Sequence, residues 1–174
     1  MTIRNILIAT GSAIALASLG TAALAAGSVQ TTAPASVTVL SPTTITKTQN
    51  LVFGSVIRPS NAGSNTVTLD VNDTVTIGNA GGGNGAAVAS VTSSAKFDVT
   101  APPATHYSTQ QSLVFGQAGL TNVAASSPTA TNGTLGDIPA GGVQELRYGG
   151  SFDMNAGTPA QAYTGTLSVT VNYN

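Results

Sequence analysis

The sequence predicts an all-β sandwich or barrel, because short β-prone segments recur along it, turn residues separate them, and no segment after residue 25 has a helical period. Alternation is clearest over residues 163–174, where every second residue from position 167 to 173 is apolar and Ser, Thr or Asn lie between. A period of two is typical of a strand with one buried and one solvated face. We expect the apolar set to be core residues, contributing roughly 6–12 kcal/mol if fully buried: Leu167, Val169, Val171 and Tyr173.

The composition of the chain argues against several classes of function. Charged residues make up 6% of the 174-residue chain, aromatic residues make up 5%, and the net charge is −1. Proteins average about 25% charged residues, so the predicted surface is mainly uncharged Thr, Ser and Asn. Such a chain has no basic footprint for nucleic acid or anionic lipid, and its near-zero charge favours association. It has no cysteine, which excludes thiol nucleophiles, thiolate metal sites and disulfide bonds.

The first 25 residues have the pattern of a secretory signal peptide. Arg4 gives the positive start, residues 6–19 are mostly apolar, and Ala23-Leu-Ala25 fits the small-x-small cleavage pattern. We expect the mature protein to begin at Ala26 and to be secreted. No later segment is apolar enough to predict a membrane span.

Residues 26–42 are predicted to form an N-terminal extension, and residues 43–174 a single β domain. The odd positions of the extension make one face of small or apolar side chains, which is the candidate donor strand: Val29, Thr31, Ala33, Ala35, Val37 and Val39. Pro34, on the other face, lacks the N–H that a central strand needs and favours an edge strand. Three interpretations stay open: the strand is donated to another copy, it pairs within its own domain, or the segment is disordered.

Further strands are expected along residues 43–174. The clearest signal is a hairpin of residues 65–71 and 74–77, with five inward residues: Val67, Leu69, Val71, Val75 and Ile77. The other strands are expected at residues 45–48, 51–57, 87–91, 95–100, 108–115 and 143–152, the last with a bulge or bend at Gly149-Gly150. Residues 80–85 are expected to be a flexible loop, and residues 118–139 have no clear strand pattern.

No group of residues predicts catalysis, and we expect the protein not to be an enzyme. His106, the single histidine, follows a proline-rich stretch and is expected to be a solvated loop residue. The acids show no paired context typical of a glycosidase, and residues 70–73 lack the central Gly and distal Glu of a calcium loop. Residues 81–85 lack the Lys and the helix of a phosphate-binding loop. No catalytic, metal or cofactor residue is therefore assigned from the sequence.

The chain resembles the bacterial family called domain of unknown function 4402. The resemblance is carried by Leu51-Val-Phe-Gly54, Thr66-Val-Thr-Leu69, Phe97-Asp-Val-Thr100, Leu146-Arg-Tyr-Gly-Gly150 and the ending from Tyr163-Thr-Gly-Thr166 to Val169-Thr-Val-Asn-Tyr173. It covers about the whole mature chain and implies a secreted immunoglobulin-like β-sandwich with no assigned activity. More distantly the chain is similar to chaperone–usher pilin subunits, which typically donate an N-terminal strand and have a penultimate aromatic residue, here Tyr173. It lacks the cysteine pair of many such pilins.

The patterns and the resemblance together predict a structural subunit of a bacterial extracellular fibre or fimbria-like assembly that polymerises by β-strand addition. The expected partners are other copies of the chain and, by the pilin resemblance, a periplasmic chaperone and an outer-membrane usher. The protein would pass through the periplasm to the cell surface. The alternative is a monomeric secreted adhesive or binding module without catalytic activity, with residues 118–139 as its contact region.

Overall fold

The computed structural model describes residues 30–173, and the chain divides into one unit that ends at Val37 and a second that begins at Thr38. The predicted signal peptide and Val29 lie outside the described residues. Residues 30–43 form no strand and are mostly exposed, with Val39 88% exposed. Within its own chain the described part of the candidate donor strand therefore has no pairing partner, and a lone segment without a neighbour cannot complete its backbone hydrogen bonds as a strand.

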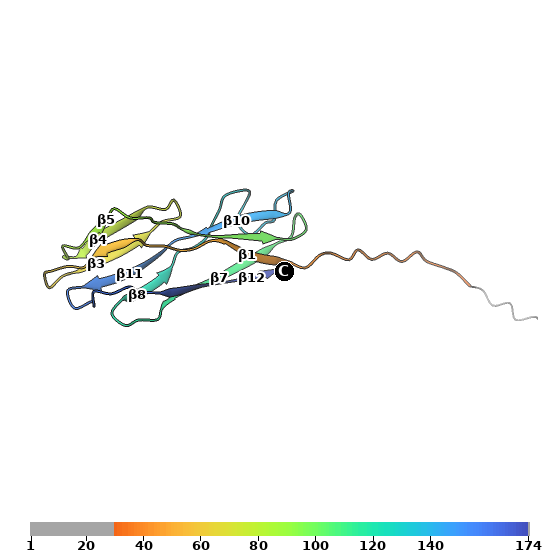
Figure 1. Ribbon diagram of the computed structural model, residues 1–174. Helices are drawn as coiled ribbons and strands as arrows, with labels where there is room; N and C mark the ends of the chain where they lie inside the picture. Colours follow the sequence, from red (N-terminus) through yellow and green to blue (C-terminus); the bar gives the residue numbers. More distant parts are fainter. Residues whose placement is uncertain (1–29, 174) are drawn as a thin grey trace, which may run out of the picture. The chain divides into compact units, whose positions relative to one another are not determined.

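The second unit is built from antiparallel strands, and residues 30–173 contain no helix, which confirms the predicted all-β class (Figure 1). One four-stranded sheet has, in order, β1 (Thr44–Gln49), β6 (Ala95–Thr100), β10 (Val143–Tyr148) and β9 (Thr129–Ala130). The other has β4 (Val75–Gly81), β3 (Ser64–Leu69), β11 (Gly150–Asn155) and β8 (Thr121–Ala125). Two separate pairs are formed by β12 (Gly165–Tyr173) with β7 (Tyr107–Phe115), and by β2 (Ser55–Ile57) with β5 (Ala86–Val88).

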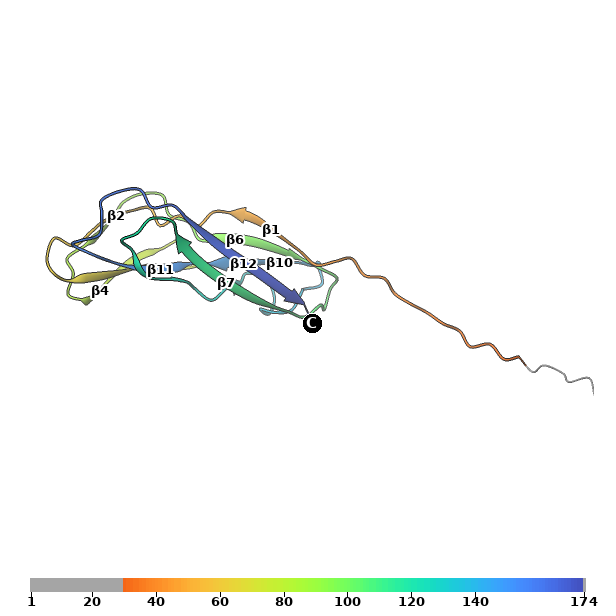
Figure 2. The same ribbon diagram turned by 90° about the horizontal axis from the view of Figure 1, so that it is seen from below.

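Two clusters of buried side chains hold these sheets together. The first joins β6 and β10 to β7 and β12, and its fully buried members include Val99, Leu146 and Tyr148. The second joins β3 and β11, through Val67, Phe152 and Met154. Figures 1 and 2 show β3, β4 and β11 toward one end of the second unit and β6 and β10 toward the other.

The consecutive strands β10 and β11 connect the two clusters through the bend predicted at Gly149-Gly150. Tyr148 ends β10 in the first sheet, and Gly150 begins β11 in the second. A Cβ atom on Gly149 would lie 2.0 Å from the main-chain oxygen of Leu69, so only glycine fits the crossing. The bend is confirmed, and the predicted strand over residues 143–152 is two strands.

The predicted hairpin is confirmed, with Val67 opposite Ile77 and Leu69 opposite Val75. Val71 lies in the turn, half-buried, and not on the inward face of a strand. The strand predicted over residues 51–57 shortens to Ser55–Ile57, because Gly54 has a φ of 73° that interrupts an extended chain.

The expectation of a flexible loop at residues 80–85 is wrong, because the buried side chain of Asn65 ties this loop down. Its Nδ2 donates to the main-chain oxygens of Gly78 and Gly83, both at 3.1 Å, and its Oδ1 accepts the N–H of Gly85 at 2.8 Å. A Cβ atom on Gly83 or Gly85 would lie within 2.7 Å of Asn65 Oδ1. The glycines therefore allow close packing around a buried amide.

Candidate functional site

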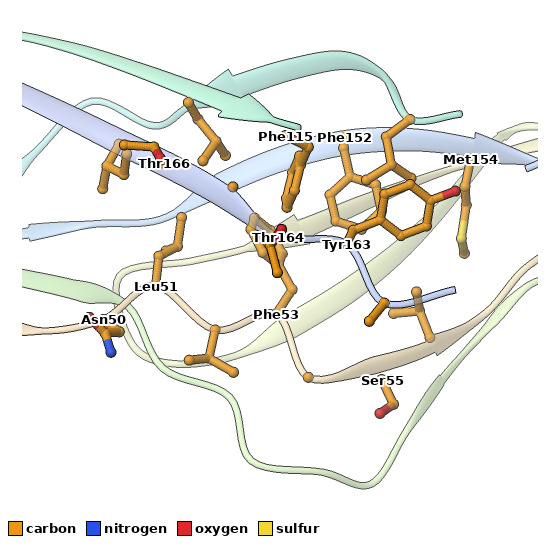
Figure 3. A pocket seen from close by; sticks show the side chains of 18 of the residues that line it. Asn50, Leu51, Phe53, Ser55, Phe115, Phe152, Met154, Tyr163, Thr164 and Thr166 are labelled. Atoms are coloured by element: carbon orange, nitrogen blue, oxygen red, sulfur yellow. The ribbon is translucent and has the colours of Figure 1, made fainter. Parts of the chain in front are cut away.

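A groove of about 1150 Å³ opens in the second unit between β1 and the start of β12. One side is lined by Lys47 and by residues 49–58, the segment that follows β1. The other side is lined by residues 158–167, which lead into β12. Figure 3 shows Leu51 below Thr166, with the groove between the two segments.

The floor of the groove is aromatic. The ring centroid of Phe53 lies 5.1 Å from that of Phe152 and 6.1 Å from that of Phe115, and the Phe115 and Phe152 rings meet edge-on at 5.7 Å (Figure 3). Tyr163 packs edge-on against Phe115 at 6.5 Å. Edge-to-face contacts are a favourable arrangement of aromatic rings, so the floor is a stable apolar surface. The aromatic floor is therefore suited to contact apolar groups of a ligand.

Each of the two strands beside the groove has a free edge. β1 is the outermost strand of its sheet, and among residues 30–173 β12 pairs with β7 alone (Figure 2). The β12–β7 register runs unbroken from Gly165 opposite Phe115 to Tyr173 opposite Tyr107. A free strand edge presents unpaired N–H and C=O groups that can pair with another strand.

The inward side chains next to these edges are only partly covered. Leu167, Val169 and Val171 pack against the first core cluster, on the face predicted from the sequence, but all three are only half-buried. Ile45 on β1 lies opposite fully buried Val99 and is nevertheless 37% exposed. The inward faces of β1 and β12 are thus only partly covered by the described part of the chain.

The prediction that Tyr173 is a core residue is wrong, since its side chain is 63% exposed. It is the last residue of β12, and among residues 30–173 no strand lies at the outer edge of β12 to cover the ring. Of the candidate donor residues, the described ones are all exposed and outside any strand: Thr31, Ala33, Ala35, Val37 and Val39.

His106 pairs with Asp137, with Nδ1 and Oδ1 2.5 Å apart. The two side chains are 73% and 46% exposed, and ion pairs in that setting contribute little to stability. Within the described part of the chain, no three His, Cys, Asp or Glu side chains lie close enough to hold a metal ion. No helix among residues 30–173 is long and apolar enough to cross a membrane.

The acids of the β3–β4 turn organise the backbone. Asp70 Oδ1 accepts the N–H groups of Asn72 and Thr74 at 2.9 and 2.8 Å, which is ordinary turn behaviour for Asp. Asp73 Oδ1 accepts the N–H of Ser94 at 2.6 Å, and this bond lowers the pKa of Asp73 because it favours the carboxylate. These contacts tie the turn to the segment before β6.

The groove floor and Lys47 were not predicted as site residues. The available signal was the alternation of Leu51 and Phe53 just before Gly54, which placed two apolar side chains on one face but did not show what they lined. The pieces of the groove come from residues 47–58, 95–97, 113–120, 152–154 and 158–167, and only the folded chain brings them together.

The fold and the groove define an all-β domain with an open apolar face between two free strand edges. The chain belongs to the family described as Domain of unknown function (DUF4402), whose sequence model matches residues 43–173. The match begins one residue before β1 and confirms the resemblance seen in the sequence. No curated protein and no solved structure matches the chain significantly.

Proposed function

We propose that the protein is a structural subunit of a bacterial extracellular fibre and that it polymerises by β-strand addition. In this proposal the second unit is an immunoglobulin-like sandwich that lacks one strand, and residues 29–39 of another copy, the donor segment, supply it. The observation that carries the proposal is the free edge of β12 beside an apolar groove. An added strand gains main-chain hydrogen bonds at such an edge, and its alternate side chains fill pockets.

The donor segment has the length that this role requires. Its eleven residues span about 36 Å as a strand, at a rise of about 3.3 Å per residue. The nine residues of β12 span about 30 Å by the same rise, so the donor segment can run along the whole strand.

The donor segment also has side chains to bury. Val37 and Val39 are 87% and 88% exposed, and burying a valine side chain contributes about 1.5–3 kcal/mol. Half-buried Leu167, Val169 and Val171 would gain cover in the same step. Apolar surface on both partners therefore favours association.

The proposal places the mature protein at the cell surface. Residues 1–25 direct it through the inner membrane as a cleaved signal peptide. A periplasmic chaperone covers the groove in transit, and an outer-membrane usher guides subunit exchange. The role is structural and includes no catalytic step.

Size-exclusion chromatography and electron microscopy test this proposal on two secreted proteins, the full chain and a form that keeps the leader but lacks residues 26–40. We expect the full chain to form long polymers and the shortened form to stay monomeric. A synthetic peptide of residues 29–39 should raise the melting temperature of the shortened form, whereas the same peptide with Val37→Asp should not, because a buried unpaired carboxylate is costly.

A stable monomer of the full chain whose melting is unchanged by the deletion would contradict strand addition. If that monomer bound a glycan or a host surface, the alternative of a monomeric adhesive module would be favoured.

A further inference from the structure

Lys47 lies on the inward face of β1, where a core residue would be expected. In the first sheet it is directly opposite Phe97, which is in turn opposite Leu146, and directly paired residues project from the same face. Phe97 and Leu146 are buried core residues, whereas Lys47 is exposed and lines the groove. An inward charge on an edge strand is one way in which natural sheets limit uncontrolled pairing of that edge.

The groove supplies no counter-charge for Lys47. Its Nζ donates to Asn50 Oδ1 at 2.7 Å, which is a neutral partner. The other cation on the groove, Arg58, donates to the main-chain oxygen of Thr158 at 2.5 Å. None of the described groove residues is Asp or Glu. Burying an unpaired ammonium is costly, so a strand that fills the groove must leave the Lys47 amine at the groove mouth. A lysine can keep its amine solvated while its stem lies along an apolar surface.

A strand entering the groove must therefore share space with the stem of Lys47. The donor segment has alanines at its centre, Ala33 and Ala35, and valines at both ends. With the centre of the donor segment at Lys47, small side chains there would leave room for the stem, and the larger ones at the ends would fill the groove on either side. Larger residues at the centre would overpack the site.

We propose that Lys47 makes the groove selective for a strand whose central inward residues are alanines, as in a second copy of this chain. This inference rests on the proposed function and names the feature of the donor that the groove accepts. Lys47 is a specificity-determining residue that excludes strands with bulky central side chains.

The test uses the full secreted chain, so that each subunit carries both the donor segment and the groove. Ala33→Leu and Ala35→Leu are made singly, each in the parent background and with Lys47→Ala. Ser36→Leu, on the outward face of the donor segment, controls for added bulk. Lys96→Ala controls for lost charge, because Lys96 lies opposite Arg147 of the neighbouring strand, on the outward face of the first sheet. The polymer fraction is measured by sedimentation, and melting of the monomer checks folding.

We expect at least one alanine variant to reduce polymer formation about tenfold, the scale of overpacking a fitted site. Adding Lys47→Ala to that variant should restore the polymer fraction to within about threefold of the parent, whereas adding Lys96→Ala should not. Ser36→Leu alone should have little effect on the polymer fraction. If Lys47→Ala rescues neither variant, or Lys96→Ala rescues equally, the selectivity inference is wrong while strand addition stands. If neither alanine variant reduces polymer formation, the inference is likewise wrong. If the parent chain forms no polymer, both proposals fail.

Discussion

Replacing Phe152 by alanine removes the most buried ring of the groove floor. The side chain is 4% exposed, and its ring lies 5.1 Å from that of Phe53 and 5.7 Å from that of Phe115. Truncating a buried Phe to Ala costs about 3–5 kcal/mol through lost burial and the cavity left behind. Domains are stable by about 5–15 kcal/mol, so this is a large share of the total.

Urea unfolding and a thermal melt of the secreted full chain and its variant measure this loss. For a domain of this size we expect a fall in Tm of about 10–20 °C. Val114→Ala is the matched control, because Val114 is next to Phe115 on β7 and is 62% exposed; it should change stability by less than about 0.5 kcal/mol. A Phe152→Ala variant within about 1 kcal/mol of the parent would refute the packing of the floor.

Two further substitutions test the fold around the site. Gly149→Ala should cost several kcal/mol or prevent folding, because the new Cβ would lie 2.0 Å from the Leu69 oxygen, whereas Gly141→Ala meets no atom within 4 Å and should be near neutral in the same urea titration. Asp73 has a lowered pKa in the folded state, so its contribution to stability is present above the ordinary value of 3.8 and is lost as the pH falls through the lower folded value. In the Asp73→Asn variant, the free energy of unfolding should therefore fall less steeply as the pH is lowered through the acid range. An unchanged acid dependence would count against the Ser94 hydrogen bond.

The strands that alternate strictly were predictable because their pattern and their partners are local. The hairpin of β3 and β4 needs only a short turn between two alternating runs, and β6 matches its predicted bounds of residues 95–100. The strand predicted at residues 108–115 is β7, Tyr107–Phe115. Local alternation also placed Leu167, Val169 and Val171 on the face that meets the core.

The parts that were missed depend on distant partners. Whether Tyr173 is buried depends on a neighbour at the outer edge of β12, and alternation does not reveal that neighbour. Lys47 looks like a surface residue until its register with Phe97 is known. The glycine-rich loop looks flexible in the sequence because Asn65, which ties it down, lies 18 residues before Gly83 and 20 before Gly85.

In the proposed fibre, the donor segment of one copy enters the groove of another beside β12. The chain has no cysteine, so two introduced cysteines can report this contact without background. Ser36→Cys on the outward face of the donor segment is combined with Ser168→Cys or Thr170→Cys on the outward face of β12, since a disulfide needs Cα atoms about 4.4–6.8 Å apart. Strand addition predicts a ladder of covalent multimers on a non-reducing gel for at least one pair, collapsed by reductant. A monomer with an internal disulfide, or polymers with no cross-link in either pair, would contradict it.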